Sequence, residues 1–501
     1  MTQVKTAITP TRQENFPEWY QSVVREGQLA ENSDVRGCMI ILPQGLSLWE
    51  NIKTYLNLHF KRTNHKNAYF PLLIPKSYLE EEAAHVDGFA KECAVVTHTK
   101  LGLNSDGELV PQGKLEEPYI IRPTSETIIG HSFAKWIQSY RDLPVLINQW
   151  ANVMRWEMRT RIFLRTSEFL WQEGHTAHAT REEAVKETKL ILDIYSKMAS
   201  DILALAPFIG SKTEDEKFPG AEITYCLEAM MQDGKALQAG TSHYLGQNFA
   251  KAQKIKFVDE QGEHQLAHTT SWGVTTRLIG ALIMTHADDN GLIIPPRVAE
   301  YHAMIIPIFR NDEEKAAVMK VANELKDSLF EKMFFNNPIA AEIDESALRG
   351  GEKFWRAVKK GYPFIIELGP KDIEKNQICL IKRNQENLKD KAFMKIDTFI
   401  EMASDELTTM QQDIYQKAVN FRETHTFEMT SKNKFVEFFK KDKKGFISCF
   451  AHENLPDEIK SLLKELKVTA RCIPLASEEE RGTCLFTQKE NAKKMIFAKA
   501  Y

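Results

Sequence analysis

Apolar positions in the first 300 residues follow helical spacing in some stretches and extended spacing in others. The first helical stripe consists of Leu48, Ile52, Tyr55, Leu56 and His59. An extended apolar segment comes next, at residues 68–75. A second helical stripe consists of Leu190, Ile194, Met198 and Ile202. These two spacings predict a region of mixed helices and strands.

The pattern changes twice further along the chain. A strand candidate at 302–309 is followed by a helical stripe and by strand candidates at 339–343 and 362–368, which together predict a small α/β module. The helical stripe consists of Val318, Val321, Leu325, Leu329 and Met333. From about residue 404 we expect a helix, a lysine-rich stretch and short strands. We therefore predict three domains, at 1–300, 301–403 and 404–501.

Composition narrows the class of protein. The 501 residues are 43% hydrophobic and 27% charged, and no run approaches the roughly 18 apolar residues that a membrane span needs. The first twenty residues carry no signal-peptide or transit-peptide pattern. The seven cysteines are scattered along the chain and do not resemble the disulfide framework of a secreted protein. We expect a cytoplasmic protein with no membrane partner. A net charge of -4 predicts no DNA partner and leaves RNA contacts to local basic patches.

Candidate chemistry begins in a predicted hairpin. Because side chains alternate along a strand, Phe169, Trp171, Glu173 and His175 share one face, and Glu168, Leu170, Gln172 and Gly174 share the other. The first face is an aromatic pocket wall with an acid and an imidazole. The preceding strand, at 145–157, carries Arg155 and Glu157 on a common face.

Arginines in two places suggest phosphate binding. The link between the two strands carries Arg159, Arg161 and Arg165, and guanidinium groups bind phosphate oxygens in a bidentate fork. Solvated loop arginines are the more common reading of such a link. Arg277, however, lies at the start of a predicted helix, where its positive charge is unfavourable next to the positive end of the helix dipole. Binding a triphosphate would explain why an arginine stands there.

These segments resemble the three motifs of the class II aminoacyl-tRNA synthetases. The hairpin is similar to motif 2, the Arg277 helix to motif 3, and the helix and strand ending at Pro75 to motif 1, which builds the dimer interface. The segments 122–130, 163–180, 237–249 and 271–277 narrow the resemblance to the archaeal and eukaryotic type of the prolyl-tRNA synthetase family. It implies a multidomain α+β fold, with an antiparallel catalytic sheet flanked by helices, an α/β anticodon-binding domain and a small α+β C-terminal domain.

The resemblance also implies substrates and partners: L-proline, ATP with Mg²⁺, tRNA(Pro) and a second copy of the chain. The implied proline site is Thr124, Glu126, Arg155, Trp171, Glu173, His175, His243, Ser271 and Gly273. The implied ATP site is Arg155, Glu157, Arg165, Thr166, Phe169, Gln172, Gln238, Thr241, Thr275 and Arg277. Arg155 on the α-phosphate and Arg277 on the γ-phosphate are the implied catalytic residues, Phe169 would stack on adenine, and Glu157 is a candidate Mg²⁺ ligand.

The chemistry of proline agrees with these positions. Its apolar ring suits an aromatic wall, and its secondary ammonium needs an anionic partner, for which Glu126 is our choice. An ordinary acid at a helix N-terminus, after a capping Thr124 or Ser125, would look the same. Both roles are compatible.

The resemblance carries three accessory expectations. For anticodon binding the resemblance points to Lys353, Phe354 and Lys360, although a solvated helix face with a core aromatic would look alike. Tyr501 would bring its terminal carboxylate near the active site unless the terminus is frayed. The segment 176–270 is too short for the bacterial editing insertion.

Zinc is not expected. Relatives often hold it with four cysteines in the C-terminal domain, but only Cys449 and Cys484 remain here, with Asn454 and Thr487 at the other two positions. Two cysteines, even with His452, do not complete a tetrahedral site.

Two alternatives remain open. A related synthetase for threonine, histidine or glycine would share these motifs, but a threonyl enzyme would need zinc ligands in its pocket. A catalytically silent paralogue would be expected to lack a motif arginine, and both Arg155 and Arg277 are present.

Overall fold

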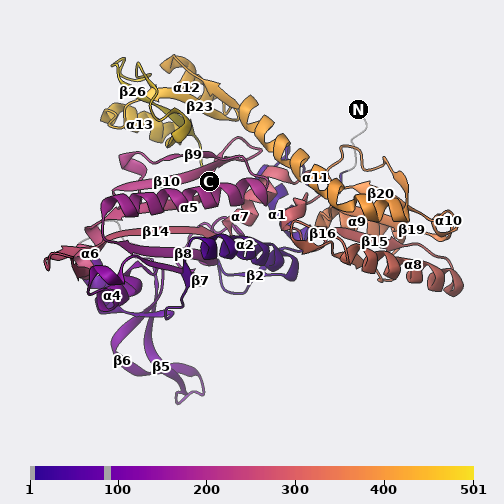
Figure 1. The fold of residues 1–501 in the computed structure, drawn as a ribbon, viewed down its shortest axis with the longest axis horizontal. Coiled ribbons are helices and arrows are strands. Elements are labelled where there is room, and N and C mark those ends of the chain that lie inside the picture. Colours follow the sequence, from indigo (N-terminus) through magenta and orange to yellow (C-terminus); the bar gives the residue numbers. More distant parts are fainter. Residues whose placement is uncertain (1–5, 84–91) are drawn as a thin grey trace.

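The computed structural model describes residues 6–83 and 92–501, so part of the N-terminal stretch discussed above lies outside it. One long sheet organises the chain (Figure 1). Its catalytic part runs in the order β3 (Lys66–Asn67), β7 (Val145–Met154), β8 (Glu168–His178), β14 (His268–Thr275), β11 (Ala236–Gly246), β10 (Ile223–Met230) and β9 (Phe208–Ser211). Neighbours are antiparallel except for the edge pair β3–β7. The predicted antiparallel catalytic sheet is confirmed.

Helices cover this sheet and bury the largest core. The helices in contact with that core are α1 (Phe16–Glu26), α2 (Pro43–Arg62), α5 (Arg181–Asp201) and α7 (Arg277–His286). Helix α5 lies over β10, β11 and β14, running alongside the strands (Figure 1), and begins with a capping box in which the Thr180 hydroxyl accepts from the backbone N–H of Glu183. Helices α4 (Glu126–Trp136) and α6 (Asn248–Gln253) share a smaller core near β8.

A long ribbon projects from the catalytic region (Figure 1). It consists of β5 (Ala94–Leu103) and β6 (Leu109–Ile121), with β4 (Leu73–Pro75) paired to the base of β6. Helix α3 (Lys76–Ala83) follows β4. The remaining small pairs are β1 (Ala30–Asn32) with β2 (Met39–Ile41) and β12 (Lys256–Val258) with β13 (His264–Leu266).

The second region is the predicted α/β module. Its sheet runs in the order β18 (Ala341–Ile343), β15 (Ala303–Pro307), β19 (Phe364–Leu368), β20 (Gln377–Lys382) and β21 (Ala392–Lys395), and its first three strands are parallel. Its helices are α8 (Asp312–Phe330), α9 (Gly350–Lys360) and α10 (Pro370–Glu374). Met333, which the sequence placed in the helical stripe, lies beyond the end of α8, in the two-residue strand β16 (Met333–Phe334), which pairs with β17 (Asn337–Pro338).

Helix α11 (Ile396–Thr424) leads from this module to the C-terminal region. The predicted boundary at residues 403–404 falls inside it, because one buried apolar stripe spans that point. The stripe consists of Phe399, Ala403, Leu407, Met410 and Ile414. Among the described residues, no helix is long and apolar enough to cross a membrane.

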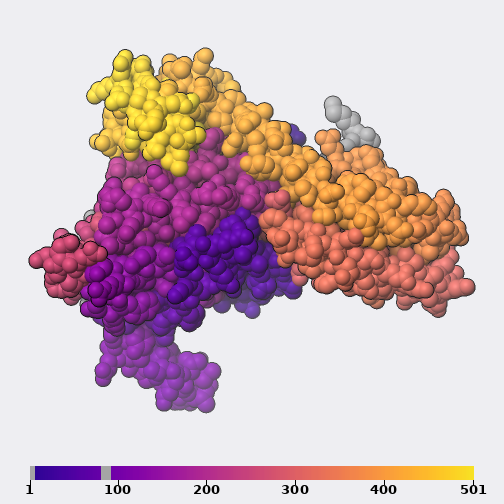
Figure 2. Space-filling model, viewed as in Figure 1, coloured from indigo at the N-terminus to yellow at the C-terminus, as the bar shows by residue number. Residues whose placement is uncertain are grey.

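The C-terminal region extends the catalytic sheet instead of standing apart. Strand β24 (Thr469–Pro474) pairs with β9, and the order continues through β26 (Ala492–Ala498), β23 (Phe446–Ala451) and β22 (Thr426–Glu428), with β25 (Arg481–Gly482) beside β26. Helices α12 (Lys432–Lys440) and α13 (Asp457–Leu466) pack on it. Gly210 permits the junction, since a Cβ there would lie 2.5 Å from the carbonyl oxygen of Ile473. The two regions are in direct contact (Figure 2).

Candidate active site

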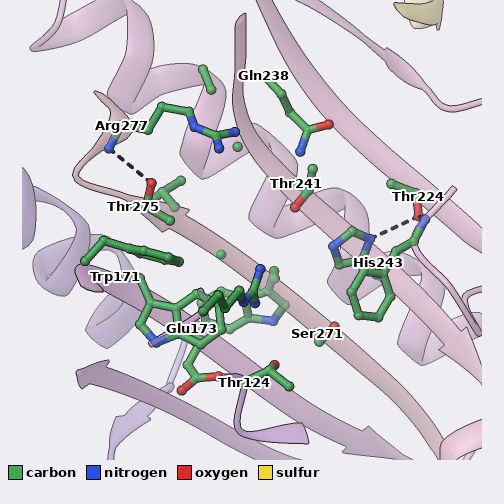
Figure 3. Close-up of a pocket in the computed structure, with 18 of the residues that line it drawn as sticks. Thr124, Trp171, Glu173, Thr224, Gln238, Thr241, His243, Ser271, Thr275 and Arg277 are labelled. Carbon is green, nitrogen blue, oxygen red and sulfur yellow. Dashed lines mark hydrogen bonds between the residues drawn. The ribbon is translucent and has the colours of Figure 1, made fainter. Parts of the chain in front are cut away.

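A pocket of about 400 Å³ opens on one face of the catalytic sheet (Figure 3). It collects the predicted proline and ATP residues with one exception. Those that line it are Thr124, Glu126, Arg155, Glu157, Arg165, Thr166, Phe169, Trp171, Glu173, His175, Gln238, Thr241, His243, Ser271, Gly273, Thr275 and Arg277. Residues far apart in the sequence therefore share a single cavity.

Gln172 is the exception. It lies on the opposite face of β8, where its Nε2 donates to Asn148 Oδ1 at 2.7 Å and its Oε1 accepts from the Tyr195 hydroxyl at 2.5 Å. The side chain is fully buried. Strand alternation already assigned Gln172 to that face, so its side chain does not line the pocket in which the resemblance placed it.

Strand register explains why the pocket residues converge. Ser271 on β14 lies opposite His175 on β8 and opposite His243 on β11, which forms one row across three strands. Gly273 lies between Glu173 and Thr241 in the next row. Directly opposed residues share a face of the sheet. These rows therefore point into the pocket together.

Two carboxylates in the pocket have different surroundings. Buried Glu173 accepts hydrogen bonds from Ser125 Oγ at 2.5 Å and Gln149 Nε2 at 2.8 Å, and lies 3.1 Å from His175 Nε2. Glu126 begins α4, and among the described residues its carboxylate accepts one side-chain hydrogen bond, from Thr124. Loss of hydration raises the pKa of Glu126, partly offset by His175. Glu126 is the carboxylate with acceptor capacity left for a cation.

Two arginines present their terminal nitrogens to the pocket. Arg155 Nε donates to the Pro123 carbonyl at 2.7 Å, and its guanidinium carbon lies 5.8 Å and 5.6 Å from the ring centroids of Phe169 and Trp171. Arg277 Nε donates to the Leu164 carbonyl at 3.2 Å. Within the described chain no hydrogen bond occupies the terminal nitrogens of either group, and such a pair suits a phosphate.

His243 closes the other end of the pocket. Its Nδ1 lies 3.0 Å from the Thr224 hydroxyl, and its ring packs on Phe218 with centroids 4.6 Å apart. Burial lowers the pKa of His243 to about 3, so its imidazole is neutral at pH 7. Thr224, Phe218, Glu216 and Lys217 also line the pocket, and sequence reasoning missed them. The pairing of Thr224 with His243 places the segment 216–224 at the pocket, and no local sequence pattern predicts that pairing.

Tyr501 docks beside the pocket without lining it. Its hydroxyl donates to Asp233 Oδ2 at 2.7 Å, and its backbone N–H donates to the Ala236 carbonyl at 3.1 Å. The guanidinium carbon of Arg161, from the link between β7 and β8, lies 6.0 Å from its ring centroid. The C-terminus is therefore held in place, and the ring of Tyr501 lies next to the link between β7 and β8.

The predicted anticodon residues differ in exposure. Lys353 is buried, and its Nζ donates to the Asp344 carbonyl at 2.7 Å, because this side of α9 faces the sheet. It is therefore not part of an exposed basic face. Phe354 and Lys360 are half-buried, whereas Trp355 is 40% exposed.

The remnants of the zinc site lie in the C-terminal core. Cys449 and Cys484 are buried, and the described neighbourhood leaves His452 Nε2 buried without a hydrogen-bond partner. Among the described residues no group of three or more His, Cys, Asp or Glu could hold a metal ion. Two thiols and one imidazole do not fit a closed four-ligand zinc site.

Comparisons with known proteins agree with this geometry. Residues 110–286 match the family described as tRNA synthetase class II core domain (G, H, P, S and T), and residues 302–406 match the anticodon binding domain family. The proline–tRNA ligase of Rhodopirellula baltica is 55% identical over 99% of this chain and 98% of its own length. That of Bdellovibrio bacteriovorus is 52% identical, with 99% of each chain covered.

Solved structures resemble the whole chain as well. The prolyl-tRNA synthetase of Cryptosporidium parvum complexed with L-proline and AMP has a TM-score of 0.87 at 35% identity, covering 99% of this chain and 97% of its own. The same enzyme complexed with halofuginone and AMPPNP has a TM-score of 0.88 at 36% identity, with the same coverage. The chain matches the class II core and the anticodon-binding family, and its relatives match it along the full length. It therefore belongs to the prolyl-tRNA synthetase family.

Proposed function

We propose that this chain forms prolyl-adenylate from L-proline and ATP in the pocket, and then transfers the prolyl group to the 3′ end of tRNA(Pro). The observation that carries the proposal is the placement of Glu126 and an aromatic wall beside two arginines with open terminal nitrogens. This combination suits an apolar cyclic ammonium next to a triphosphate.

In the first step an oxygen of the proline carboxylate attacks the α-phosphorus of ATP. The new oxygen–phosphorus bond forms as the bond to the β-phosphate breaks, and pyrophosphate leaves. Glu126 binds the proline ammonium, Trp171 packs on its ring, and Arg155 offsets the charge that develops at the α-phosphate. Catalysis then comes from positioning two anions together and stabilising charge.

The remaining pocket residues hold the nucleotide. Arg277 binds the γ-phosphate, with its backbone N–H fixed by Thr275 Oγ1 at 3.1 Å. Phe169 stacks on adenine. Further contacts come from Arg165, Thr166, Gln238 and Thr241. ATP enters as its magnesium complex, and Glu157, whose Oε2 lies 4.0 Å from Arg165 Nε, is the carboxylate that we assign to the metal.

In the second step the terminal ribose hydroxyl of tRNA attacks the prolyl carbonyl carbon, and AMP leaves. No enzyme side chain becomes covalently attached. The α/β module would bind the anticodon. The segment between β8 and β14 holds α5, β9 to β11, α6, β12 and β13, with no large editing insertion.

The assembly belongs to the same proposal. We assign the motif 1 region to a homodimer interface, and we place the enzyme in the cytoplasm with its tRNA. Tyr501 beside Arg161 would support the link between β7 and β8 when the tRNA end enters.

Replacing Arg155 tests the first step. We expect Arg155→Ala to abolish proline-dependent exchange of pyrophosphate into ATP, because its guanidinium is the cation assigned to the α-phosphate. Arg159→Ala is the matched control, since Arg159 lies close by in the link between β7 and β8, is exposed and does not line the pocket. Near-normal exchange by a folded Arg155→Ala enzyme, or equal loss in the control, would refute the assignment. A panel of amino acids in the same assay tests the preference for proline.

A further inference from the structure

A buried ionic cluster joins the C-terminal region to the catalytic sheet. Glu228, on β10, is fully buried. Its Oε1 accepts from Lys212 Nζ at 2.6 Å and from a terminal nitrogen of Arg471 at 3.1 Å, and its Oε2 accepts from Arg471 Nε at 3.0 Å. Arg471 lies on β24, so one of the two cations comes from the C-terminal region. A buried carboxylate is tolerated when charged partners of this kind satisfy it.

Strand register places this cluster beside the ATP half of the pocket. Glu228 lies directly opposite Gln238 in the pairing of β10 with β11. Gln238 lines the pocket, and opposed residues share a face of the sheet. Four positions back along β10, Thr224 also lines the pocket on that face. Glu228 therefore points toward the side of the sheet where the nucleotide would bind.

The Glu228 carboxylate is close enough to Arg277 to act on its charge. Burial lowers the pKa of Arg277, the neighbouring Arg165 and Arg155 lower it further, and Glu228 acts in the opposite direction by favouring the charged guanidinium. Both oxygens of Glu228 are nevertheless occupied by Lys212 and Arg471. The terminal nitrogens of Arg277 accordingly carry no hydrogen bond to a described residue.

We propose that Arg471 is a positioning residue for ATP: by occupying Glu228 from the C-terminal region, it keeps the Arg277 guanidinium available to the triphosphate. Arg471 itself does not line the pocket. The C-terminal region thereby sets the charge balance of the ATP site, in addition to covering the sheet edge at β9. This inference rests on the role proposed for Arg277.

Steady-state kinetics of Arg471→Met test the proposal in the pyrophosphate exchange assay. With one oxygen of Glu228 left without its donor, Arg277 turns toward it. We expect the KM for ATP to rise by about tenfold, in line with the loss of a charged hydrogen bond, while the KM for proline changes less than about twofold. Arg471→Lys, which retains a positive charge, should lie between the variant and the parent. A rise in both KM values together would overturn the proposal.

A second substitution separates charge from structure. In the double variant Arg471→Met with Glu228→Gln the competing charge is gone, so the KM for ATP should return toward that of the parent even if the melting temperature does not. A double variant no better than the single one would overturn the proposal. Arg422→Met is the matched control, because Arg422 donates from α11 to the Pro207 carbonyl at 3.3 Å, beside β9, with no contact to Glu228. The same ATP effect in that control would mean that any loosening of this edge suffices, and would also refute the role of Arg471.

Discussion

Glu126 and Glu173 show how two carboxylates in one pocket take different roles. Glu173 is buried and held by Ser125, Gln149 and His175, so it is a fixed part of the wall. Glu126 stands at the first position of α4, where the helix N-terminus also favours an anion. The position of Glu126 at the start of α4 is therefore compatible with both readings. It can be an ordinary acid at a helix N-terminus and, in the proposed function, the ligand of the proline ammonium group.

The raised pKa of Glu126 predicts that proline binding in the proposed site depends on pH. A carboxyl group whose pKa lies above its usual 4.5 takes up a proton at a higher pH than a free glutamate does, and the neutral acid no longer attracts the proline ammonium. We expect the KM for proline to rise as pH falls through that raised value, while the KM for ATP stays nearly constant.

Glu126→Gln is the variant that isolates this effect. It should raise the KM for proline at pH 7 by about 30-fold, which corresponds to about 2 kcal/mol for a charged hydrogen bond. Its KM for proline should no longer depend on pH in this range. Because the ionised form is disfavoured in the folded protein, the empty variant should be no less stable than the parent at pH 7. An unchanged pH profile would show that another group titrates.

Trp355 is a better test of tRNA binding than Lys353. Lys353→Glu would place a carboxylate beside buried Asp344, so it would destabilise the module and impair everything that depends on its folding. Trp355 is 40% exposed on the same helix and offers a surface for an unpaired base. We expect Trp355→Ala to lower the rate of tRNA charging several-fold and to leave pyrophosphate exchange unchanged. Equal loss of both reactions would exclude a role confined to tRNA.

At the scale of elements, local sequence patterns predicted the helices and strand faces that local interactions determine. The stripe through Leu190 and Met198 forms α5, and alternation along 168–178 placed the pocket face of β8 correctly. The same alternation excluded Gln172, which the resemblance had included. Long-range pairing was not predictable: nothing near Thr224 signals that it lies opposite His243, and nothing near Ile473 signals that β24 joins β9. Lys353 was placed on an exposed basic face and is buried instead, because helical spacing alone does not say which face of α9 is inward.

One ion pair fixes the α/β module to the catalytic region. Arg383, only 1% exposed, donates to both carboxylate oxygens of Asp288 at 2.9 Å and 2.5 Å. Burial alone would raise the pKa of Asp288, but the Arg383 guanidinium outweighs it and the pKa is lowered. The Arg383–Asp288 pair therefore contributes fully to stability above the pKa of Asp288 in the unfolded chain, about 3.9. This contribution is lost as pH falls through the lower pKa that Asp288 has in the folded protein.

Arg383→Met should lower the free energy of unfolding at pH 7 by about 3 kcal/mol, because the Asp288 carboxylate loses its buried cation and keeps the backbone N–H of Asn290 as a donor. Lys359→Met is the matched control: Lys359 joins the same two regions through Glu26 at 2.8 Å, but both side chains are about one-third exposed, so less than about 1 kcal/mol is expected. Thermal unfolding followed by circular dichroism compares the two. Equal losses would show that burial does not distinguish these pairs.

At the scale of the whole molecule, the C-terminal region has an apolar core of its own. Buried phenylalanines dominate this core: Phe435, Phe438, Phe439, Phe486 and Phe497. Its strands are also tied to the catalytic sheet through β24. Small domains depend on metals when they cannot bury enough apolar surface alone, and this one shares a sheet with a much larger neighbour.

We therefore predict that the purified protein carries less than about half an equivalent of zinc by elemental analysis, and that a chelator leaves its melting temperature unchanged, because a closed structural site needs four ligands. Burial raises the pKa of Cys449, and the nearby Cys484 raises it further, so this thiol stays protonated when no cation is present. Asn454→Cys with Thr487→Cys would give the four-cysteine spacing that the family resemblance implies, and this double variant should bind about one equivalent of zinc. A stoichiometric metal in the parent protein would show that His452 and a fourth group complete the site. Failure of the double variant to take up zinc would show instead that the apolar core has closed around the two remaining cysteines.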